Sequence, residues 1–483
     1  MRRLALGTAV IASLLPTLFA CTTVGPDYRL PETALVKDPA ASAALVDREN
    51  HAATNEPVPD DWWRLYNDPN VDELVKRALV ANTSLRVAAA NLQRTIENYH
   101  EVEAENLLQG GINATTQRTQ LSGESFLLTK KVPVLNIGDY GMGVSYLVDL
   151  FGKLARADEA ALANVEASQA ALDAVRVAVV AQTVRAYVEG CAAIHELQVA
   201  DRQLALQERV VGLTRMLVAA GRNEPGDVAQ ADAQAERLRA LLPRFKARQT
   251  AAAYRLSVML GEPPNSTRRD CRRMPTLEKP LPVGDGTALL RRRPDVRQAE
   301  RELASSAARI GVATADLFPT IRIGASAGVT GVLGDLGSEQ TVHWGFGPMI
   351  TWNFPSNGAI PHIHAMRAAS DAALARFDGV VLKALEETRT ALSTYGYEIE
   401  RSASLQKSRD AAAVAAREKR ELYAGGKVSS LTSLDADRVL VDIEQALADS
   451  DAQVALQQVV LFEALGGGWE HAPVPMIKHA AED

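Results

Sequence analysis

The chain has 483 residues, of which 47% are hydrophobic and only 5% aromatic. Alanine, valine and leucine supply most of the apolar residues, a mixture that excludes a disordered chain and favours coiled coil over a thick globular core. The net charge of -7 and the lack of a basic tail or long charge block argue against a nucleic-acid-binding protein, so no nucleic-acid partner is expected.

Residues 1–20 predict a bacterial lipoprotein signal peptide. Basic residues precede an apolar run from Leu4 to Leu18, and Ala20 stands directly before Cys21. We therefore expect cleavage before Cys21 and a covalent lipid on its sulfur, with no other cofactor. The alternative is an uncleaved membrane helix, but this run of about 15 residues is shorter than the ~20 needed to span a bilayer. No later segment is expected to span a membrane as a helix.

Residues 21–60 are expected to be a lipid-anchored extension with little to pack against, because proline, alanine and polar residues dominate it. A helical pattern begins at Asp61. Its expected inward positions are Leu74, Leu79, Leu85 and Leu92.

An internal repeat of roughly 200 residues organises the rest of the chain. The stretch from Ala220 to Ala231 matches that from Gly425 to Ala436, and Val148–Phe151 falls opposite Thr351–Phe354. Each copy is predicted to hold a short helix, two strands and two long helices. The predicted repeats are residues 61–283 and 284–470, followed by a C-terminal tail at 471–483.

The long helices carry heptad patterns. No glycine or proline interrupts the chain between Lys153 and Glu189, and apolar residues recur there every seven positions, as they do in the second copy. The first helical pattern continues to about Ala220, which predicts a rod of roughly 100 Å. The heptad residues are Val165, Leu172, Val179 and Ala186 in the first copy, and Leu385, Leu392 and Ile399 in the second.

Alternating stretches predict four β-strands, at 140–149, 321–330 and 344–354 and, more weakly, after Gln109. Their length of about 10 residues and their terminal aromatics suit tilted transmembrane strands, although a soluble hairpin with one wet face is an alternative. Bacterial barrels have at least about eight strands, so four must be shared between copies. Three copies give about twelve strands, whereas two give a lumen filled by side chains.

At Leu289–Arg301, followed by Ala308–Ala313 and Leu317–Pro319, the sequence resembles the outer membrane factor (TolC-like) family, in its lipoprotein branch serving resistance-nodulation-division efflux systems. Residues 149–153, 431–438 and 465–469 match as well. The resemblance implies a mainly α protein with transmembrane β: a homotrimer with a twelve-strand β-barrel in the outer membrane, an α-helical barrel in the periplasm and an equatorial domain.

The resemblance also implies a function. Such a duct conducts substrates passively, and it receives them from an inner-membrane pump through a periplasmic adaptor (membrane fusion) protein. The expected localisation is the outer membrane, with the chain anchored by lipid and extending into the periplasm. The expected cargo is drugs or other small molecules.

By resemblance, Leu431 and Asp435 close the periplasmic aperture, and their spacing places both on one helix face. Threefold symmetry would turn them into an apolar ring and a cation-attracting ring of carboxylates. The expected tip contacts are Tyr423, Thr432 and Arg438. The alternative is local: Thr432 and Asp435 fit a capping box, in which Asp435 merely caps a helix.

Cys191 and Cys271 are a candidate disulfide. Counted from the turn near Glu224, Cys191 lies about 50 Å along one helix, and the return helix ends near Leu260 at about 54 Å. Both therefore reach one level, from which Cys271 is a short linker away. Two free thiols acting as small apolar groups are the alternative.

Other classes of function fit the sequence less well. No enzyme is expected, because the eight histidines lack metalloprotease-type spacing, and His362 and His364 suit a solvated turn better than a metal site. A periplasmic coiled-coil lipoprotein scaffold without a pore would not need the strands. A metal-ion or type I secretion duct of the same fold is a further alternative, although the methionines are scattered.

Overall fold

The structure, a computed structural model, describes residues 23–46, 52–124, 127, 129–222, 224–264, 271, 274–277 and 280–473. The predicted signal peptide and Cys21 lie outside the described residues. The chain forms two compact units. Each predicted repeat contributes residues to both units. One comprises Met1–Pro31, Gln93–Ala167 and Ala299–Phe377, and the other comprises Glu32–Leu92, Ser168–Gln298 and Asp378–Asp483.

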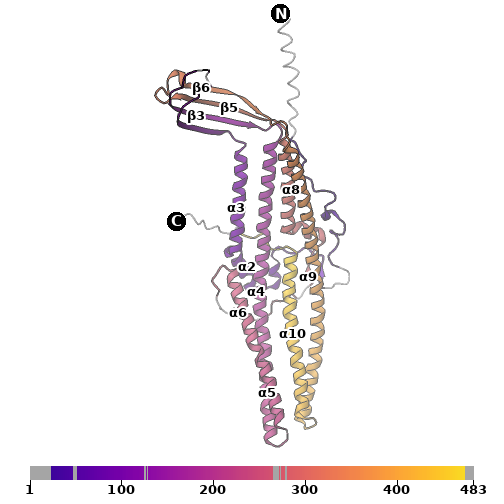
Figure 1. Cartoon of the computed structure of the whole chain (residues 1–483). Helices are drawn as coiled ribbons and strands as arrows, with labels where there is room; N and C mark the ends of the chain where they lie inside the picture. Colours follow the sequence, from indigo (N-terminus) through magenta and orange to yellow (C-terminus); the bar gives the residue numbers. More distant parts are fainter. Residues whose placement is uncertain are drawn as a thin grey trace. The chain divides into compact units, whose positions relative to one another are not determined.

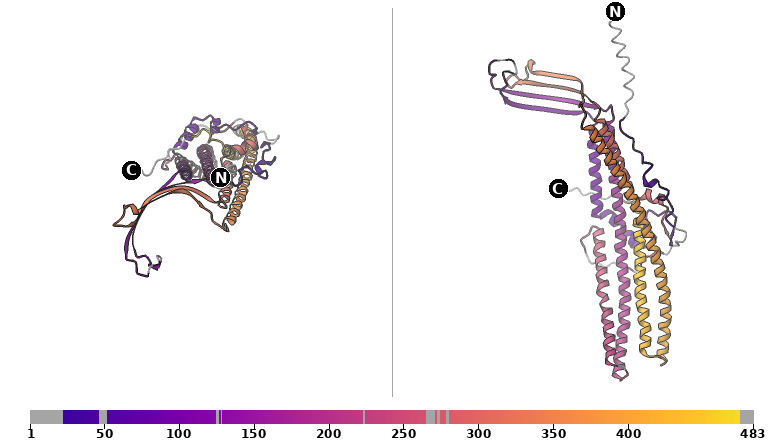
Figure 2. Two further views of the ribbon diagram at one scale, coloured as in Figure 1. Left: turned by 90° about the horizontal axis from the view of Figure 1, so that it is seen from above. Right: turned by 45° about the vertical axis from the view of Figure 1, so that its right-hand side comes forward.

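The first unit contains a four-stranded antiparallel sheet of order β2-β3-β5-β6 (Figure 1). The prediction of four strands is confirmed, including the weak one after Gln109. The strands follow a curved course when seen from above (Figure 2). They are β2 (Gln109–Thr119), β3 (Leu135–Val148), β5 (Thr320–Val332) and β6 (Val342–Thr351).

The strand register gathers the apolar side chains on one face of this sheet. Met142 lies opposite Ile112 on one side and Ala327 on the other, and Ala327 lies opposite Trp344. Because side chains alternate along a strand, these four point to the same face. The neighbouring row on the other face is Gly111, Gly143, Ser326 and Gly345. One face is therefore apolar, and the other is lined by small or polar residues.

The apolar face is uncovered within one chain. Ile112 is 85% exposed and Trp344 is 80% exposed. A contiguous apolar surface of this kind is stable only against another apolar phase, whether protein or lipid.

The last strand is shorter than predicted. We expected it to continue through Phe354, but β6 ends at Thr351. The partner of Thr351 is Thr320, the first residue of β5, so no strand remains for Trp352 to pair with. Trp352 instead donates from its indole Nε1 to the carbonyl of Leu317 at 3.2 Å.

Long uninterrupted helices are present in both repeats, as predicted: α4 has 67 residues and α9 has 66. The return helix of the first repeat is interrupted, contrary to prediction. It consists of α5 and α6, which meet at Ala240, because Pro243 has no N–H to continue the helical ladder there. The helices are α2 (Pro69–Ala81), α3 (Thr83–Ala104), α4 (Lys153–Ala219), α5 (Pro225–Arg239), α6 (Leu241–Met259), α7 (Gly286–Arg292), α8 (Pro294–Ala315), α9 (Ala359–Ala424) and α10 (Ser430–Ala464).

In the second unit, α5 and α6 run beside α4, and α10 runs beside α9 (Figures 1 and 2). The α4–α5 contact is apolar, with Leu204 and Val211 packed against Ala235 and Leu238. The heptad prediction places Leu172 inside, where it is 3% exposed. The seams therefore hold the hairpins together by apolar packing.

The main core of the second unit gathers around two tryptophans. Trp62, in the 3-10 helix η3 (Trp62–Tyr66), stacks on Phe462 of α10 with ring centroids 4.6 Å apart. Leu74 and Leu85 are buried there as predicted. This core joins α2, α4 and α10, which are far apart in the sequence.

The N-terminal extension is not the loose tether that we predicted. Ala34 is 2% exposed and Ala41 is 5% exposed, and the backbone N–H of Leu35 donates to Asp378 at 2.9 Å. Strand β1 (Ala53–Thr54) pairs in parallel with β4 (Leu281–Pro282). Main-chain hydrogen bonds dock this segment, which explains why its low apolar content misled the prediction.

Among the described helices, α4 contains a stretch that is long and apolar enough to cross a membrane, which the sequence analysis did not identify. Two-thirds of that stretch is buried inside the protein. Core packing within the chain accounts for its composition.

Candidate functional site

The two helical hairpins end in turns with the same hydrogen bonds. In the first turn, Gly221 donates to the carbonyl of Val218 and Arg222 donates to that of Leu217, both at 2.9 Å. Gly426 and Lys427 repeat these bonds with Tyr423 and Leu422, also at 2.9 Å. Each glycine has a positive φ, of 71° and 70°, which is the left-handed end of a Schellman motif.

The predicted gate residues lie just after the second turn, on the first turns of α10. Leu431 is 72% exposed, and the side chain of Asp435 is 73% exposed. Arg438 approaches Asp435 at 4.0 Å, which is a weak exposed ion pair. Within one chain the side chains of Leu431 and Asp435 are therefore exposed to solvent, so both can face a lumen.

The alternative in which Asp435 caps the helix is wrong. Helix α10 begins at Ser430, and its cap is Ser429, whose hydroxyl accepts from the backbone N–H of Thr432 at 3.2 Å. Asp435 stands beyond the four N–H groups that a cap can satisfy. In the first hairpin Asp227 occupies the place of Thr432, and its carboxylate accepts from the N–H of Glu224 at 3.3 Å.

Polar contacts that the sequence analysis missed hold the hairpins near these turns. Gln203 of α4 is 3% exposed and donates to the carbonyl of Val441 of α10 at 2.6 Å. Asp437 lies 3.3 Å from Arg420 of α9, and burial raises the pKa of its carboxyl. These residues meet only when the helices pack, so local sequence carries little signal of them.

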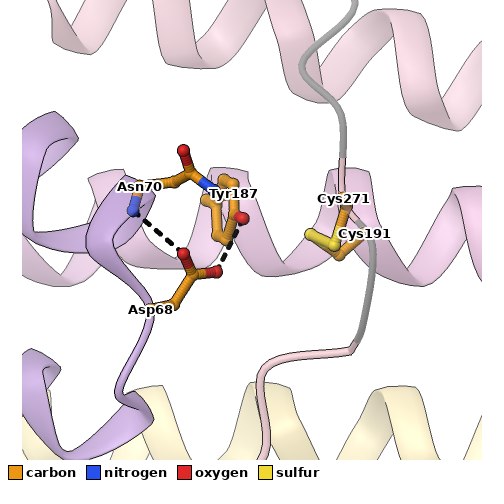
Figure 3. The surroundings of a disulfide bond; sticks show 5 residues. All are labelled: Asp68, Asn70, Tyr187, Cys191 and Cys271. Atoms are coloured by element: carbon orange, nitrogen blue, oxygen red, sulfur yellow. Dashed lines mark hydrogen bonds between the residues drawn. A yellow bond between two sulfur atoms is a disulfide. The ribbon is translucent and has the colours of Figure 1, made fainter.

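The structure joins Cys191 and Cys271 with their sulfurs 2.13 Å apart, so it favours a disulfide over the free thiols (Figure 3). Tyr187, one turn before Cys191 on α4, donates to Asp68 at 2.8 Å. Burial and the Asp68 carboxylate raise the pKa of Tyr187. Asp68 also caps α2, so α4 holds both α2 and the linker that follows α6.

The arginine and glycine motifs that carry the family resemblance contact each other. Arg292 donates to the carbonyl of Val58 at 2.7 Å and to Glu470 at 2.7 Å. Arg293 donates to the carbonyl of Ala464 at 2.8 Å, at the end of α10. A Cβ added to Gly467 would stand 2.7 Å from Arg292 Nη2, so the glycine makes room for this guanidinium.

The other end of the motif meets the last tryptophan. The guanidinium of Arg297 lies over the ring of Trp469, 4.8 Å from its centroid. Arg297 and Arg176 both face the buried carboxylate of Asp173, at 3.6 and 2.7 Å. Burial raises the pKa of Asp173, and the two arginines oppose that rise. These motif residues therefore stabilise the fold.

A further contact that the sequence analysis missed lies in the first unit. Arg156 of α4 has a side chain only 5% exposed, and it binds Asp27 at 2.7 Å and the carbonyl of Val24 at 3.2 Å. Gly152, with φ of 75°, lies against Thr23, where an added Cβ would clash at 2.4 Å. The segment directly after Cys21 and Thr22 is thus bound at the start of α4.

His362 and His364 lie in the first turns of α9 and not in the predicted turn, and both are exposed. Within the described ranges, no cluster of three or more histidine, cysteine or carboxylate side chains is placed to hold a metal ion.

Comparison with known proteins places the chain in a family. The model of the family described as "Outer membrane efflux protein" matches residues 74–262 and 287–467. The outer membrane protein OprJ of Pseudomonas aeruginosa is 29% identical, over 97% of each chain. The toluene efflux pump outer membrane protein TtgC of Pseudomonas putida is 27% identical, over 96% of each. The solved structure of the outer-membrane channel OprN superposes with a TM-score of 0.82 at 33% identity, covering 93% of this chain and all of that one. The chain therefore belongs to the outer membrane efflux protein family.

Proposed function

We propose that three copies of this outer-membrane efflux protein close into one duct, through which substrates of an efflux pump leave the cell. The observation that supports this assembly most directly is the four-stranded sheet, which has an exposed apolar face and two unpaired edges, β2 and β6.

Closure follows from the chemistry of the bilayer. Backbone N–H and C=O groups in lipid must all be paired, so a sheet crosses a membrane only when its edges meet. Three copies supply twelve strands and bring each β2 beside a β6 of the next copy. Two copies would supply eight strands and a bore filled by side chains, which suits a conduit poorly.

The apolar face, with Trp344 and Ile112, would then meet lipid, and the glycine-lined face would meet the bore. The long helices would continue the duct into the periplasm. An adaptor protein would bind at the hairpin turns and connect the duct to an inner-membrane pump of the resistance-nodulation-division type. The expected cargo remains drugs or other small molecules.

Leu431 and Asp435 form the gate in this proposal, and Tyr423, Thr432 and Arg438 support it. The exposure of Leu431 and Asp435 in the single chain is what a lumen-facing ring requires. Three leucines make an apolar constriction, and three carboxylates favour cations over anions.

Acylation at Cys21 is a separate proposal, supported by the apolar run that ends there. Mass spectrometry of the mature N-terminus tests it. A diacylglycerol-modified Cys21 is expected, and an unmodified or uncleaved N-terminus would contradict it.

Cross-linking of the sheet edges tests the assembly. Ala114→Cys on β2 is combined in turn with Val342→Cys, Trp344→Cys and Phe346→Cys on β6, because the register between copies must be scanned. A short bis-maleimide should give a ladder that stops at three chains. Val144→Cys with Ala325→Cys is the matched control, since these residues lie opposite each other within one sheet. A ladder that stops at two chains, or no ladder at any position, contradicts the trimer.

A further inference from the structure

A cleft of about 490 Å³ lies in the second unit, between α4, α9, α10 and the start of α8. Its volume falls in the range of small-molecule binding sites, roughly 300–1,000 Å³. The α4 side of the cleft is apolar and consists of Ala174, Val177 and Ala178. The cleft therefore offers an apolar surface to a ligand of moderate size.

The charged groups that line the cleft are unbalanced. Four carboxylates belong to the lining, and the guanidinium of Arg293 is its one cationic group. Arg293 is already paired, with Asp295 at 2.6 Å and Glu387 at 2.8 Å. It also donates to the carbonyl of Ala464, so its donors are engaged at one end of the cleft. Among the described residues, neither Glu386 nor Glu463 forms an ion pair within 4 Å, although Arg185, which does not line the cleft, interacts with Glu463 at longer range.

Glu463 occupies an unfavourable position for a carboxylate. It stands in the last turn of α10, where the negative end of the helix dipole disfavours an anion. Burial raises the pKa of its carboxyl and outweighs the opposing effect of Arg185, while the nearby Glu387 raises the pKa further and Arg293 opposes it. In the described part of the chain Glu463 makes no direct hydrogen bond or ion pair, so Arg185 and Arg293 offset these costs only in part. A carboxylate that is held in an unfavourable electrostatic environment within a cavity is typical of a functional site.

We propose that this cleft binds an organic cation, which packs its apolar part on α4 and places its positive group at Glu463. Glu386 is exposed, so it stands where it can attract the approaching cation. The proposal rests on the proposed function in one respect: the cation would be a substrate in transit.

A metal ion is a poorer occupant. Divalent metals require several converging oxygen, nitrogen or sulfur ligands, and no such group of three forms within the described residues. The apolar wall would leave a bare ion without ligands on one side, whereas it suits the rings or chains of an organic amine. An anion would meet an excess of carboxylates over cationic groups in the lining.

Binding of two xanthene dyes of opposite charge tests the proposal. Purified full-length protein in detergent is titrated with rhodamine 6G, a lipophilic cation, and with fluorescein, an anion of similar size, while fluorescence polarisation is followed. We expect the wild type to bind rhodamine 6G and not fluorescein, with affinity that falls as salt is added. Empty micelles measure partition of dye into detergent.

Two variants locate the binding. Glu463→Gln keeps the shape of the side chain and should raise the Kd for rhodamine 6G at least about tenfold. Ala178→Phe should abolish binding by filling the cleft without a change of charge. Glu418→Gln is the matched control, because Glu418 lies exposed on α9 outside the cleft, and its Kd should equal that of the wild type.

The outcomes separate this inference from the proposed function. Equal Kd values for the wild type and Glu463→Gln, or equal binding of both dyes, overturn the cation site even if the protein still forms conducting trimers. If the wild-type protein does not conduct in bilayers but still binds rhodamine 6G in a Glu463-dependent way, the proposed duct is contradicted and the cation site is retained.

Discussion

The buried ion pair between Glu196 of α4 and Arg248 of α6 should control how firmly these two helices hold together. The Glu196 side chain is 1% exposed, and Arg248 Nη1 lies 2.5 Å from its Oε2. The other oxygen, Oε1, is buried without a partner. Burial raises the pKa of Glu196, and Arg248 is the strongest of the groups that oppose the rise.

Arg248→Leu would leave this carboxylate buried and unpaired. Breaking a buried pair in this way costs about 3–5 kcal/mol, and the lower end applies because the Arg248 side chain is 35% exposed. The cost must depend on pH. A carboxyl whose folded pKa is raised stabilises the fold below its unfolded pKa, and this stability is lost as pH rises through the folded pKa. The variant should therefore be close to wild type near pH 4.5 and weakest at pH 8.

Hydrogen exchange measured by mass spectrometry reports this local stability without requiring reversible unfolding. A loss of about 3 kcal/mol at pH 8 lowers protection of the α6 amides on the order of 100-fold, after correction for intrinsic rates. At pH 5 we expect a loss under about tenfold. Arg239→Leu breaks an exposed pair with Glu208, between α4 and α5, and is the control with little expected effect.

A double variant decides the cause. Glu196→Gln combined with Arg248→Leu removes the unpaired charge, and it should restore most of the protection and abolish the pH dependence. An Arg248→Leu defect of equal size at both pH values, or no rescue in the double variant, would refute the electrostatic argument and point to lost packing.

Three further predictions concern the disulfide, the gate and a glycine. Thiol labelling of the unreduced, denatured wild-type protein should detect no free thiol at Cys191 or Cys271. Replacing both cysteines by serine should lower the apparent melting temperature, because the disulfide closes an 80-residue loop, which stabilises the fold by about 4 kcal/mol through chain entropy. Two labelled thiols would disprove the bond. In planar bilayers, Leu431→Ala and Asp435→Ala should open more often or more widely, and the second should show weaker cation preference. Asp227→Ala is the control, because it loses a capping interaction worth about 1 kcal/mol at the start of α5, in the other hairpin, and leaves the proposed gate residues in place. Gate variants that conduct as wild type does would count against a gate at these residues. Gly466→Ala should destabilise the fold by about 1–3 kcal/mol, because φ is 70° and the new Cβ would stand 2.9 Å from Arg293 Cγ; an unchanged thermal unfolding midpoint would disprove that clash.

Local periodicity was sufficient to predict most of the secondary structure. The strands alternate because one face is apolar, and the register of Met142 against Ala327 shows that the alternation of each strand agrees with that of its neighbours. The long helices α4 and α9 contain the predicted heptad residues. The two hairpin turns were also predictable from the sequence, because Gly221 and Gly426 occupy the same left-handed position in each repeat.

Element ends and docked segments were not predictable in this way. β6 stops at Thr351 because its partner strand begins at Thr320, which the sequence of β6 cannot encode alone. The residues before Asp61 were predicted to be a tether because proline, alanine and polar residues dominate them, yet their main-chain groups bind Asp378 and β4. Hydrogen bonds from the backbone are independent of side-chain hydropathy, so composition gives no warning of them.

The sequence by itself determined the pattern of strands and helices, the repeat and the motifs that mark the family. Only the tertiary structure brought Glu463 of α10, Glu387 of α9 and Arg293 to one cleft, and Glu196 of α4 to Arg248 of α6. Periodicity is a local property set by the geometry of the backbone, whereas these charges interact only after packing has placed distant helices side by side and removed the water that would screen them.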